Sequence, residues 1–406
     1  MSPSPSANLR LLYIHHLFYS FSLTVFPVLI PPLIYQTFGS VSFFFIWNSV
    51  WTIVYLFLFL PLFNLAISLS AVRLFLIIGA GLFAVFLAVC SRITEGNEIA
   101  ACLYSALLGV AFAVYWFLRH WMISISADFR AIGRQISIFS IIIVANAVIG
   151  PSLAGYLAET YSFELALIVI ACVTVVSTFP LLLLQPPEDV KQYRIHNLGA
   201  VLAEKTPAAV RPAYFWAGMA ECFFSYSFPI AFVISIGDVM KLGFLSGGSA
   251  LAAALLIWLA GLHFDRAKRT QLLGRVTWAR FAVIACYPIL AFFPSLYLAL
   301  ILETLNRLTE RVHATVQEAY LFGISNKVHP THFQLNKEYA LTLGRLAANV
   351  TIIVAMASLP PKAMWIFVGL GAFGQLGWLT MKKVDYLFET EQSGAPSPSI
   401  IQNATP

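Results

Sequence analysis

Residues 303–314, ETLNRLTERVHA, place ionisable side chains inside a long apolar part of the sequence. At about 100° per residue, the carboxylates and guanidiniums of a helix through this segment share one stripe, and His313 points elsewhere. The stripe holds Glu303, Arg307, Glu310, Arg311 and Glu318. Spacings of three and four residues permit ion pairs along it. Such guanidiniums can attract an anionic group, and such carboxylates can carry a proton.

Charged groups are costly at this depth in an apolar helix. Each costs about 2.5 to 3.5 kcal/mol at the centre of a membrane-spanning helix, so the stripe is unfavourable by around 10 kcal/mol unless it is paired or hydrated. It must therefore face protein or water. Two interpretations remain open, because the stripe can line a polar pathway or form a structural ion-pair cluster that holds its helix to a neighbour.

A second candidate carboxylate lies in AGMAECFFSYSF, residues 217–228. Glu221 has no base in its own segment, and burial favours the neutral form of a carboxylate. It is therefore a candidate to bind and release a proton. The alternative is a neutral glutamate that is hydrogen-bonded to an adjacent helix.

A third group of candidates comprises Arg119 and His120 in YWFLRHW, residues 115–121, together with His16. Arginine near a helix end commonly reaches the lipid headgroups, where tryptophan and tyrosine also gather. We therefore expect Arg119 to lie at the membrane surface. One of His15 and His16 is expected to be interfacial as well.

Catalytic signatures were sought across the whole chain. It contains no HExxH, GxSxG, P-loop or paired-cysteine motif. We therefore predict that the chain has no enzymatic activity, binds no metal or cofactor and contains no ATP-hydrolysing unit that could drive transport.

Composition sets the class of protein that must position these residues. Of the 406 residues, 60% are hydrophobic and 10% are charged, whereas a soluble domain carries roughly 25% charged residues. The net charge of +6 is typical of cytoplasmic loops that face anionic lipid. We expect a monomer in a lipid bilayer, with no nucleic-acid partner.

Apolar stretches of about 20 residues, the length that crosses a bilayer, recur along the chain. They predict an all-α polytopic membrane protein with twelve transmembrane helices. The expected spans are 13–37, 43–66, 73–91, 99–124, 134–158, 163–185, 212–236, 245–263, 275–294, 297–323, 335–358 and 362–382.

The distribution of the 24 lysines and arginines predicts the orientation. Sixteen fall on the side that holds both termini, three on the other side and five within spans. Because positive charge favours the cytoplasmic side, we expect both termini in the cytoplasm and a location in the plasma or inner membrane.

The longest segment between spans is polar and contains prolines, QPPEDVKQYRIHNLGAVLAEKTPAAVR. It divides the chain into two six-helix bundles. The predicted parts are a first bundle at 1–185, a cytoplasmic linker at 186–211, a second bundle at 212–385 and a polar tail at 386–406.

Six spans, a linker and six spans resemble the major facilitator superfamily. The loop GLHFDRAKR is similar to that family's G-x-x-x-D-R-x-G-R signature, with a lysine in place of the last glycine. The matching residues are Gly261, Asp265, Arg266 and Arg269. The loop between the second and third spans, where the family carries its strongest copy, has no acid here.

A second similarity is GPSLAG, which resembles the family's Gly-Pro helix motif. Gly150, Pro151 and Gly155 match it, and Asn146 replaces an earlier glycine. The resemblance implies that the loop signature gates the cytoplasmic side. It also implies that spans 1, 4, 7 and 10 line a central cavity.

The resemblance implies a secondary active transporter that moves a small organic solute, anionic or zwitterionic, by alternating access with possible proton coupling. In that case Arg307, with Arg311, attracts the solute, and Glu221, Glu303 or Glu310 carries the proton or restrains the arginines. Two alternatives remain. One is a transport-inactive member that acts as an assembly or receptor protein. The other is an intramembrane transferase that uses His16 or His120.

Overall fold

The computed structural model describes five stretches of the chain. All regular elements within these stretches are helical. The described residues are 5–126, 132–204, 210–264, 269–325 and 329–384.

The first half of the chain consists of six long helices and a short 3₁₀ turn. They are α1 (Pro5–Phe38), α2 (Val41–Ser68), α3 (Val72–Cys90), α4 (Glu98–Ser126), α5 (Ile132–Thr160), α6 (Phe163–Val176) and η2 (Phe179–Leu183). The linker carries two short elements, η3 (Val190–Tyr193) and α7 (Leu198–Ala203).

In the second half, the helices are interrupted more often by π-helical and 3₁₀ turns, which are included here. They are α9 (Arg211–Ala220), the π-helical turn η4 (Glu221–Tyr226), α10 (Ser227–Ser235), α11 (Val239–Phe264), α12 (Arg269–Ala285), η5 (Tyr287–Ala291), α13 (Leu296–Ser325), α14 (Pro330–Met356), η6 (Pro361–Ala363), α15 (Met364–Leu376) and η7 (Gly377–Val384).

The sequence explains where several helices begin and end. α1 ends before Gly39, which has a φ of 64°, a conformation that glycine adopts without a steric cost. Ser40 then caps α2 by accepting a hydrogen bond of 3.1 Å from the backbone N–H of Phe43. Ser162 caps α6 in the same way through the N–H of Leu165. These caps satisfy N–H groups that a helix leaves without partners.

Ten of the described helical segments, 19 to 32 residues long, are long and apolar enough to cross a membrane. The chain is therefore an integral membrane protein. Two expected spans, 245–263 and 297–323, are not among the ten. They correspond to α11, whose described apolar part is the shorter Val239–Ala254, and to α13, where the charged stripe lowers the hydropathy.

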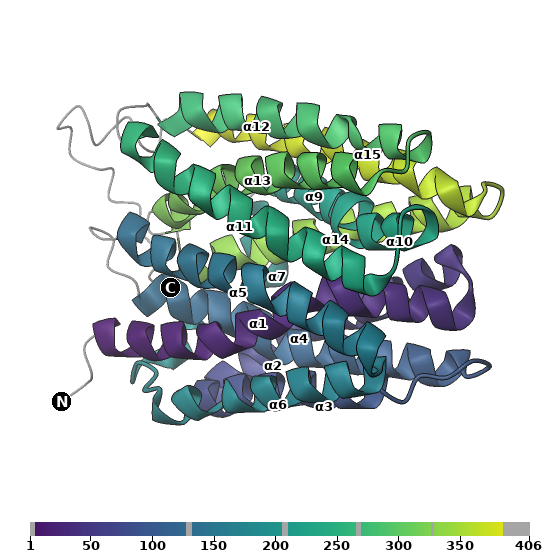
Figure 1. The fold of residues 1–406 in the computed structure, drawn as a ribbon. Helices are drawn as coiled ribbons and strands as arrows, with labels where there is room; N and C mark the ends of the chain where they lie inside the picture. The colour runs from purple at the N-terminus through teal and green to yellow at the C-terminus, as the bar shows by residue number, and fades with distance from the viewer. Residues whose placement is uncertain (1–4, 127–131, 205–209, 265–268, 326–328, 385–406) are drawn as a thin grey trace.

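The long helices run side by side, with α1–α6 on one side of the molecule and α9–α15 on the other (Figure 1). α1 begins at the end that also carries the linker, which we call the linker end. Asn8 of α1 bonds both the N–H and the C=O of Gln185 there. Asn64 of α2 does the same for Ile195. The linker is therefore tied to the first half by paired amide contacts.

The two most extensive contacts between the halves are those of α5 with α11 and of α2 with α14. We call these the α5 seam and the α2 seam. At the α5 seam a Cβ on Gly155 would lie 2.6 Å from the carbonyl oxygen of Val239, and one on Gly247 would lie 2.6 Å from that of Val148. The two helices therefore touch backbone to backbone.

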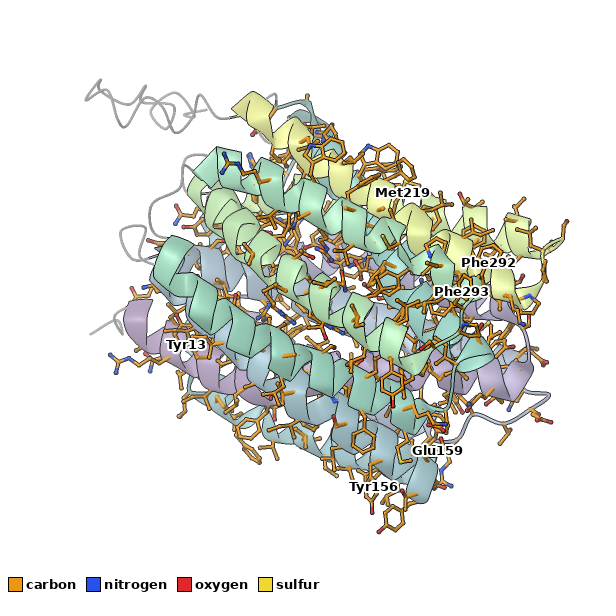
Figure 2. The ribbon with its side chains drawn as sticks, turned by 45° about the horizontal axis from the view of Figure 1, so that its top comes forward. Tyr13, Tyr156, Glu159, Met219, Phe292 and Phe293 are labelled. Atoms are coloured by element: carbon orange, nitrogen blue, oxygen red, sulfur yellow. The ribbon has the colours of Figure 1, made fainter. Side chains whose placement is uncertain are left out.

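Large apolar side chains cover the outside of the bundle. Phe292 is 79% exposed, and it lies with Phe293 and Tyr156 at the end opposite to Tyr13 (Figure 2). Phe57 and Val354 are exposed on helix exteriors. A soluble monomer rarely exposes so much contiguous apolar surface, so this surface suits contact with lipid.

Candidate functional site

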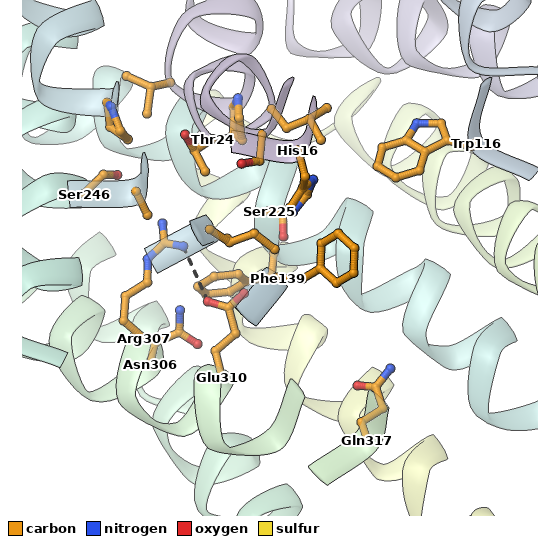
Figure 3. Close-up of a pocket in the computed structure, with 18 of the residues that line it drawn as sticks. His16, Thr24, Trp116, Phe139, Ser225, Ser246, Asn306, Arg307, Glu310 and Gln317 are labelled. Carbon is orange, nitrogen blue, oxygen red and sulfur yellow. Dashed lines mark hydrogen bonds and ion pairs between the residues drawn. The ribbon is translucent and has the colours of Figure 1, made fainter. Parts of the chain in front are cut away.

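A cavity of about 460 Å³ lies between the two halves. That volume falls in the range of small-molecule sites. Its walls come from both halves of the chain, namely from α1, α4 and α5 and from α9–α14 with η4. Part of the lining is shown in Figure 3. The walls include the spans that the family resemblance implied.

The α13 wall carries the charged stripe. Arg307 Nε lies 2.8 Å from Glu303 Oε1, and Arg307 Nη1 lies 3.4 Å from Glu310 Oε2. The second contact is visible in Figure 3. Glu303 is 1% exposed and also accepts a hydrogen bond of 2.6 Å from the hydroxyl of Tyr287. The expected pairs at spacings of three and four residues are therefore confirmed, and all three charged residues line the cavity.

Other residues of the same segment face different surroundings. Arg311 lines a small separate void beside Val144 of α5 and Ala250 of α11. His313 is buried, and its ring lies 5.8 Å from that of Trp378, which agrees with its expected position off the stripe. The side chain of Glu318 lies outside the described residues. The stripe therefore serves more than one surface.

Two polar residues near the stripe were missed by the sequence reasoning. Arg280 of α12 and Asn306 of α13 both line the cavity. Within the described part of the chain, Arg280 Nε and Asn306 Oδ1 are buried without a hydrogen-bond partner. Asn306 lies between the charged residues in sequence. Its position next to the stripe was a usable signal.

The α4 wall corrects the expectation for Arg119. This side chain is 6% exposed and lines the cavity, so its placement among the lipid headgroups is wrong. Its Nη2 lies 3.0 Å from His16 Nδ1. Its guanidinium carbon lies 5.4 Å from the ring centroid of Trp116 and 5.6 Å from that of Phe139. The face of α4 that carries Arg119 turns inward because α1 and α5 pack over it.

The expectation that one of the paired histidines is interfacial is also wrong, because both are buried. His15 contacts the hydroxyl of Tyr115 at 2.5 Å and the carbonyl of Ser177 at 2.6 Å. His16 lines the cavity. Of the two rings, His15 therefore joins helices and His16 faces the central space.

The α14 wall holds Glu338 and Lys337, which the sequence reasoning missed and which cluster with the expected candidate His120. Glu338 is buried and accepts a 2.7 Å hydrogen bond from the Tyr55 hydroxyl of α2. Its other oxygen lies 3.2 Å from His120 Nδ1 of α4 and 3.5 Å from Lys337 Nζ. Lys337 and His120 line the cavity. A usable signal was the seven-residue spacing of Glu338 and Arg345, which places both on one helix face.

Glu221 is not one of the described residues that line the cavity. Its Oε2 accepts hydrogen bonds from Arg345 Nε and Nη2 at 2.9 and 2.8 Å. Its Oε1 accepts one from the hydroxyl of Tyr226 at 3.2 Å. The base absent from its own helix is thus supplied by α14. This agrees with the alternative of fixation against a neighbouring helix, with an ion pair in place of a neutral contact.

The helix 5 motif packs against two neighbours. A Cβ on Gly150 would lie 3.0 and 3.1 Å from Val25 and Thr24 of α1, and Gly155 lies on the α5 seam. Pro151 lines the cavity. Asn146 donates hydrogen bonds of 2.7 Å to α1. The motif therefore allows α5 to approach both α1 and α11 closely.

The gate-loop residues are only partly described. Gly261 lies in α11, and Arg269 is the first residue of α12. Asp265 and Arg266 lie outside the described residues. The gate function of this loop stays a prediction.

The described cavity lining carries more positive than negative charge. Two carboxylates, Glu303 and Glu310, face four cations. The cations are Arg119, Arg280, Arg307 and Lys337. Such an excess favours a negatively charged occupant.

The chain was compared with known protein families and with curated proteins. No match was found among the curated proteins. The family model of the Major Facilitator Superfamily matches residues 12–307, which is more than half of the chain. The chain therefore belongs to the major facilitator superfamily.

Proposed function

We propose that this membrane transporter moves a small organic solute with a negatively charged group by alternating access. Family membership supports transport in general. The observation that carries the proposal is the cavity of about 460 Å³, which both halves line and in which cations outnumber carboxylates. When two halves move relative to each other around such a site, the site opens to each side in turn.

The proposal includes the membrane topology. Twelve crossings would form two six-helix bundles, at 1–185 and 212–385, joined by the linker at 186–211. Two arrangements support this. α11 and α13 pack beside the apolar helices, and the predicted topology puts sixteen of the 24 lysines and arginines on the side of the termini and the linker. The linker end would face the cytoplasm, with the chain as a monomer in the plasma or inner membrane.

The α13 stripe supplies the proposed coupling site. Arg307 contacts both Glu303 and Glu310, so the two carboxylates would restrain it in the empty transporter. Protonation of a carboxylate would weaken its ion pair and release the guanidinium. Protonation on this wall would thereby change the charge of the cavity in which the solute binds. Arg311 lines a small separate void, and Glu221 is paired with Arg345 of α14. In the proposal both would influence coupling from outside the cavity.

The gate is proposed from the family resemblance. Gly261, Asp265, Arg266 and Arg269 would hold the linker end closed through contacts of the α11–α12 loop with neighbouring helix ends. This part of the proposal rests on the motif alone.

The test begins with purified protein. A thermal-shift screen of small organic anions, cations and neutral solutes at two pH values should identify an anion that stabilises the protein. Proteoliposomes should then exchange that anion and accumulate it when a pH gradient is imposed. Glu303→Gln should keep exchange and lose the accumulation that the gradient drives.

A specific observation favours a second candidate. The stripe neutralises much of its own charge through Arg307 and its two glutamates, which also suits a transport-inactive assembly or receptor protein. In that case no solute would move in proteoliposomes, whereas binding to a protein partner would persist.

The anion specificity of the first proposal has its own test. It would be contradicted if only cations or neutral solutes stabilised the protein and were transported.

A further inference from the structure

We propose that the anionic group of the solute binds to Arg119 and His16 on the α1 and α4 wall, and that the solute is a monocarboxylate with an apolar body. This inference rests on the proposed function. It concerns two arginines, Arg119 and Arg307, that line the same cavity and differ in what surrounds them.

Arg307 already has two negative partners. Glu303 and Glu310 contact its guanidinium at 2.8 and 3.4 Å. A solute carboxylate at this position would have to displace a carboxylate that is part of the same helix. Glu303 and Glu310 are fixed on the same helix, four and three residues from Arg307. They therefore stay close to its guanidinium and compete with a solute carboxylate for it.

Arg119 has no carboxylate partner among the described residues. Its nearest groups are an imidazole of His16 at 3.0 Å and the faces of two aromatic rings, Trp116 and Phe139. A buried guanidinium without an anion is costly. Arg280 also lines the cavity with an unpartnered Nε, but it lies on α12, which packs against the charged stripe of α13. An entering anion would therefore meet no competing resident carboxylate at Arg119.

His16 supplies the second contact. The residue is 2% exposed and lines the cavity. Its Nε2 is buried without a hydrogen-bond partner among the described residues, while its Nδ1 faces Arg119. If Nδ1 accepts from the guanidinium, Nε2 carries the proton and can donate. Arg119 and His16 thus place a guanidinium and an imidazole N–H donor on the same wall of the cavity.

The surroundings favour one class of anion. A single guanidinium matches the charge and the planar geometry of a carboxylate. A phosphate monoester would require a second available cation beside Arg119. Lys337 is engaged by Glu338 at 3.5 Å and by Gln334 at 3.5 Å, and Arg280 lies on α12, which packs against the α13 wall. Trp116 and Phe139 add an apolar wall beside the charge. An aliphatic or aromatic body can pack against it.

The experiment compares two matched changes. Arg119→Gln removes the proposed anchor. Glu303→Gln combined with Arg307→Gln removes the competing arginine and keeps the net charge of the α13 wall unchanged. Wild-type protein and both variants are titrated with aromatic and aliphatic monocarboxylates, with the corresponding neutral amides and with phosphate monoesters. Affinity is read from ligand-dependent thermal stabilisation and from exchange in proteoliposomes.

The expected result is selective binding of monocarboxylates over the amides by the wild type. Arg119→Gln should weaken carboxylate binding about 10- to 100-fold, as the loss of a charged hydrogen bond implies. The double variant should retain carboxylate binding. His16→Gln should weaken binding less than Arg119→Gln. Thr351→Ala, at an exposed position of α14 outside the cavity lining, should leave binding unchanged.

If Arg119→Gln does not fold, Arg119→Lys replaces it, because lysine keeps the charge and loses the planar donor pair. Reduced carboxylate affinity in this variant supports the site. Unchanged affinity overturns it. Carboxylate binding that survives in both Arg119 variants and disappears in the double variant assigns the anion to Arg307. Preference for phosphate monoesters overturns the solute class.

The two proposals fail in different ways. If wild-type protein binds and transports anions but Arg119 variants behave like the wild type, only the site assignment is wrong. If the wild type neither binds nor transports any organic anion, the proposed function itself is wrong.

Discussion

The α5 seam and the α2 seam join the same two halves by different physical means. At the α5 seam, Gly155 and Gly247 bring helix backbones into contact. At the α2 seam, polar side chains bond across the halves, as Tyr55 does to Glu338 and Asn48 to Asn349 at 3.0 Å. Ser152 of α5 adds one hydrogen bond of 3.3 Å to the carbonyl of Gly243 of α11, so the α5 seam depends mainly on shape and the α2 seam on hydrogen bonds.

The difference indicates how the halves could move. The close backbone contact at these glycines is lost when the helices separate by even a small distance, because the dispersion attraction between atoms falls steeply with their separation. A polar contact can exchange its partner for water at a small net cost. The contacts of the α2 seam can therefore be exchanged for water at the smaller net cost. Gly155 lies near the end of α5 opposite the linker, whereas Glu338 lies nearer to the linker end of α14.

The largest effect is expected for Glu338→Ala on the α2 seam. The change leaves Lys337 and His120 without their buried carboxylate partner. Removal of one member of a buried ion pair costs about 3 to 5 kcal/mol. Chemical unfolding in detergent should show this loss in the free energy of unfolding. A loss below about 0.5 kcal/mol, the usual size of a surface substitution effect, would show that the cluster does not hold the seam.

A smaller effect is expected for Gly155→Val on the α5 seam. Its Cβ would lie 2.6 Å from a backbone carbonyl, and a backbone atom cannot move aside as a side chain can. Overpacking of this kind costs about 1 to 3 kcal/mol. The apparent melting temperature should fall, and transport should slow. Unchanged values for both would mean that the helices separate there without cost.

Tyr55→Phe should have a still smaller effect, because it deletes one hydroxyl and keeps the ring. Glu338 loses a 2.7 Å hydrogen bond but keeps its contacts with His120 and Lys337. We expect a loss of about 1.5 kcal/mol in the free energy of unfolding. Combined with Glu338→Ala it should add little, since both changes remove one interaction. Full additivity would argue against direct coupling of the two residues.

The smallest effect is expected for Gly248→Ala, the matched control for Gly155. Nothing lies within 4 Å of a Cβ placed on Gly248, and alanine favours a helix over glycine by about 1 kcal/mol. The melting temperature should stay equal or rise slightly, with transport unchanged. A decrease as large as that of Gly155→Val would show that glycine content, and not the close crossing, governs the seam.

Much of the candidate site on α13 was predictable. The pairs of Glu303 and Glu310 with Arg307 depend on helix periodicity alone, and they form as the spacing predicted. The placement of Arg119 was not predictable in this way. Its position near the end of α4 suggested the membrane surface, but Phe139 of α5 and His16 of α1 cover it.

The sequence by itself determined that the chain lies in a membrane, that it is helical and that its α13 stripe pairs internally. These properties depend on composition and on residues within one or two turns of each other. Only the tertiary structure decided that Arg345 neutralises Glu221 and that Tyr55 bonds Glu338. These partners are 124 and 283 residues apart, and no local pattern records which distant helix faces will pack together.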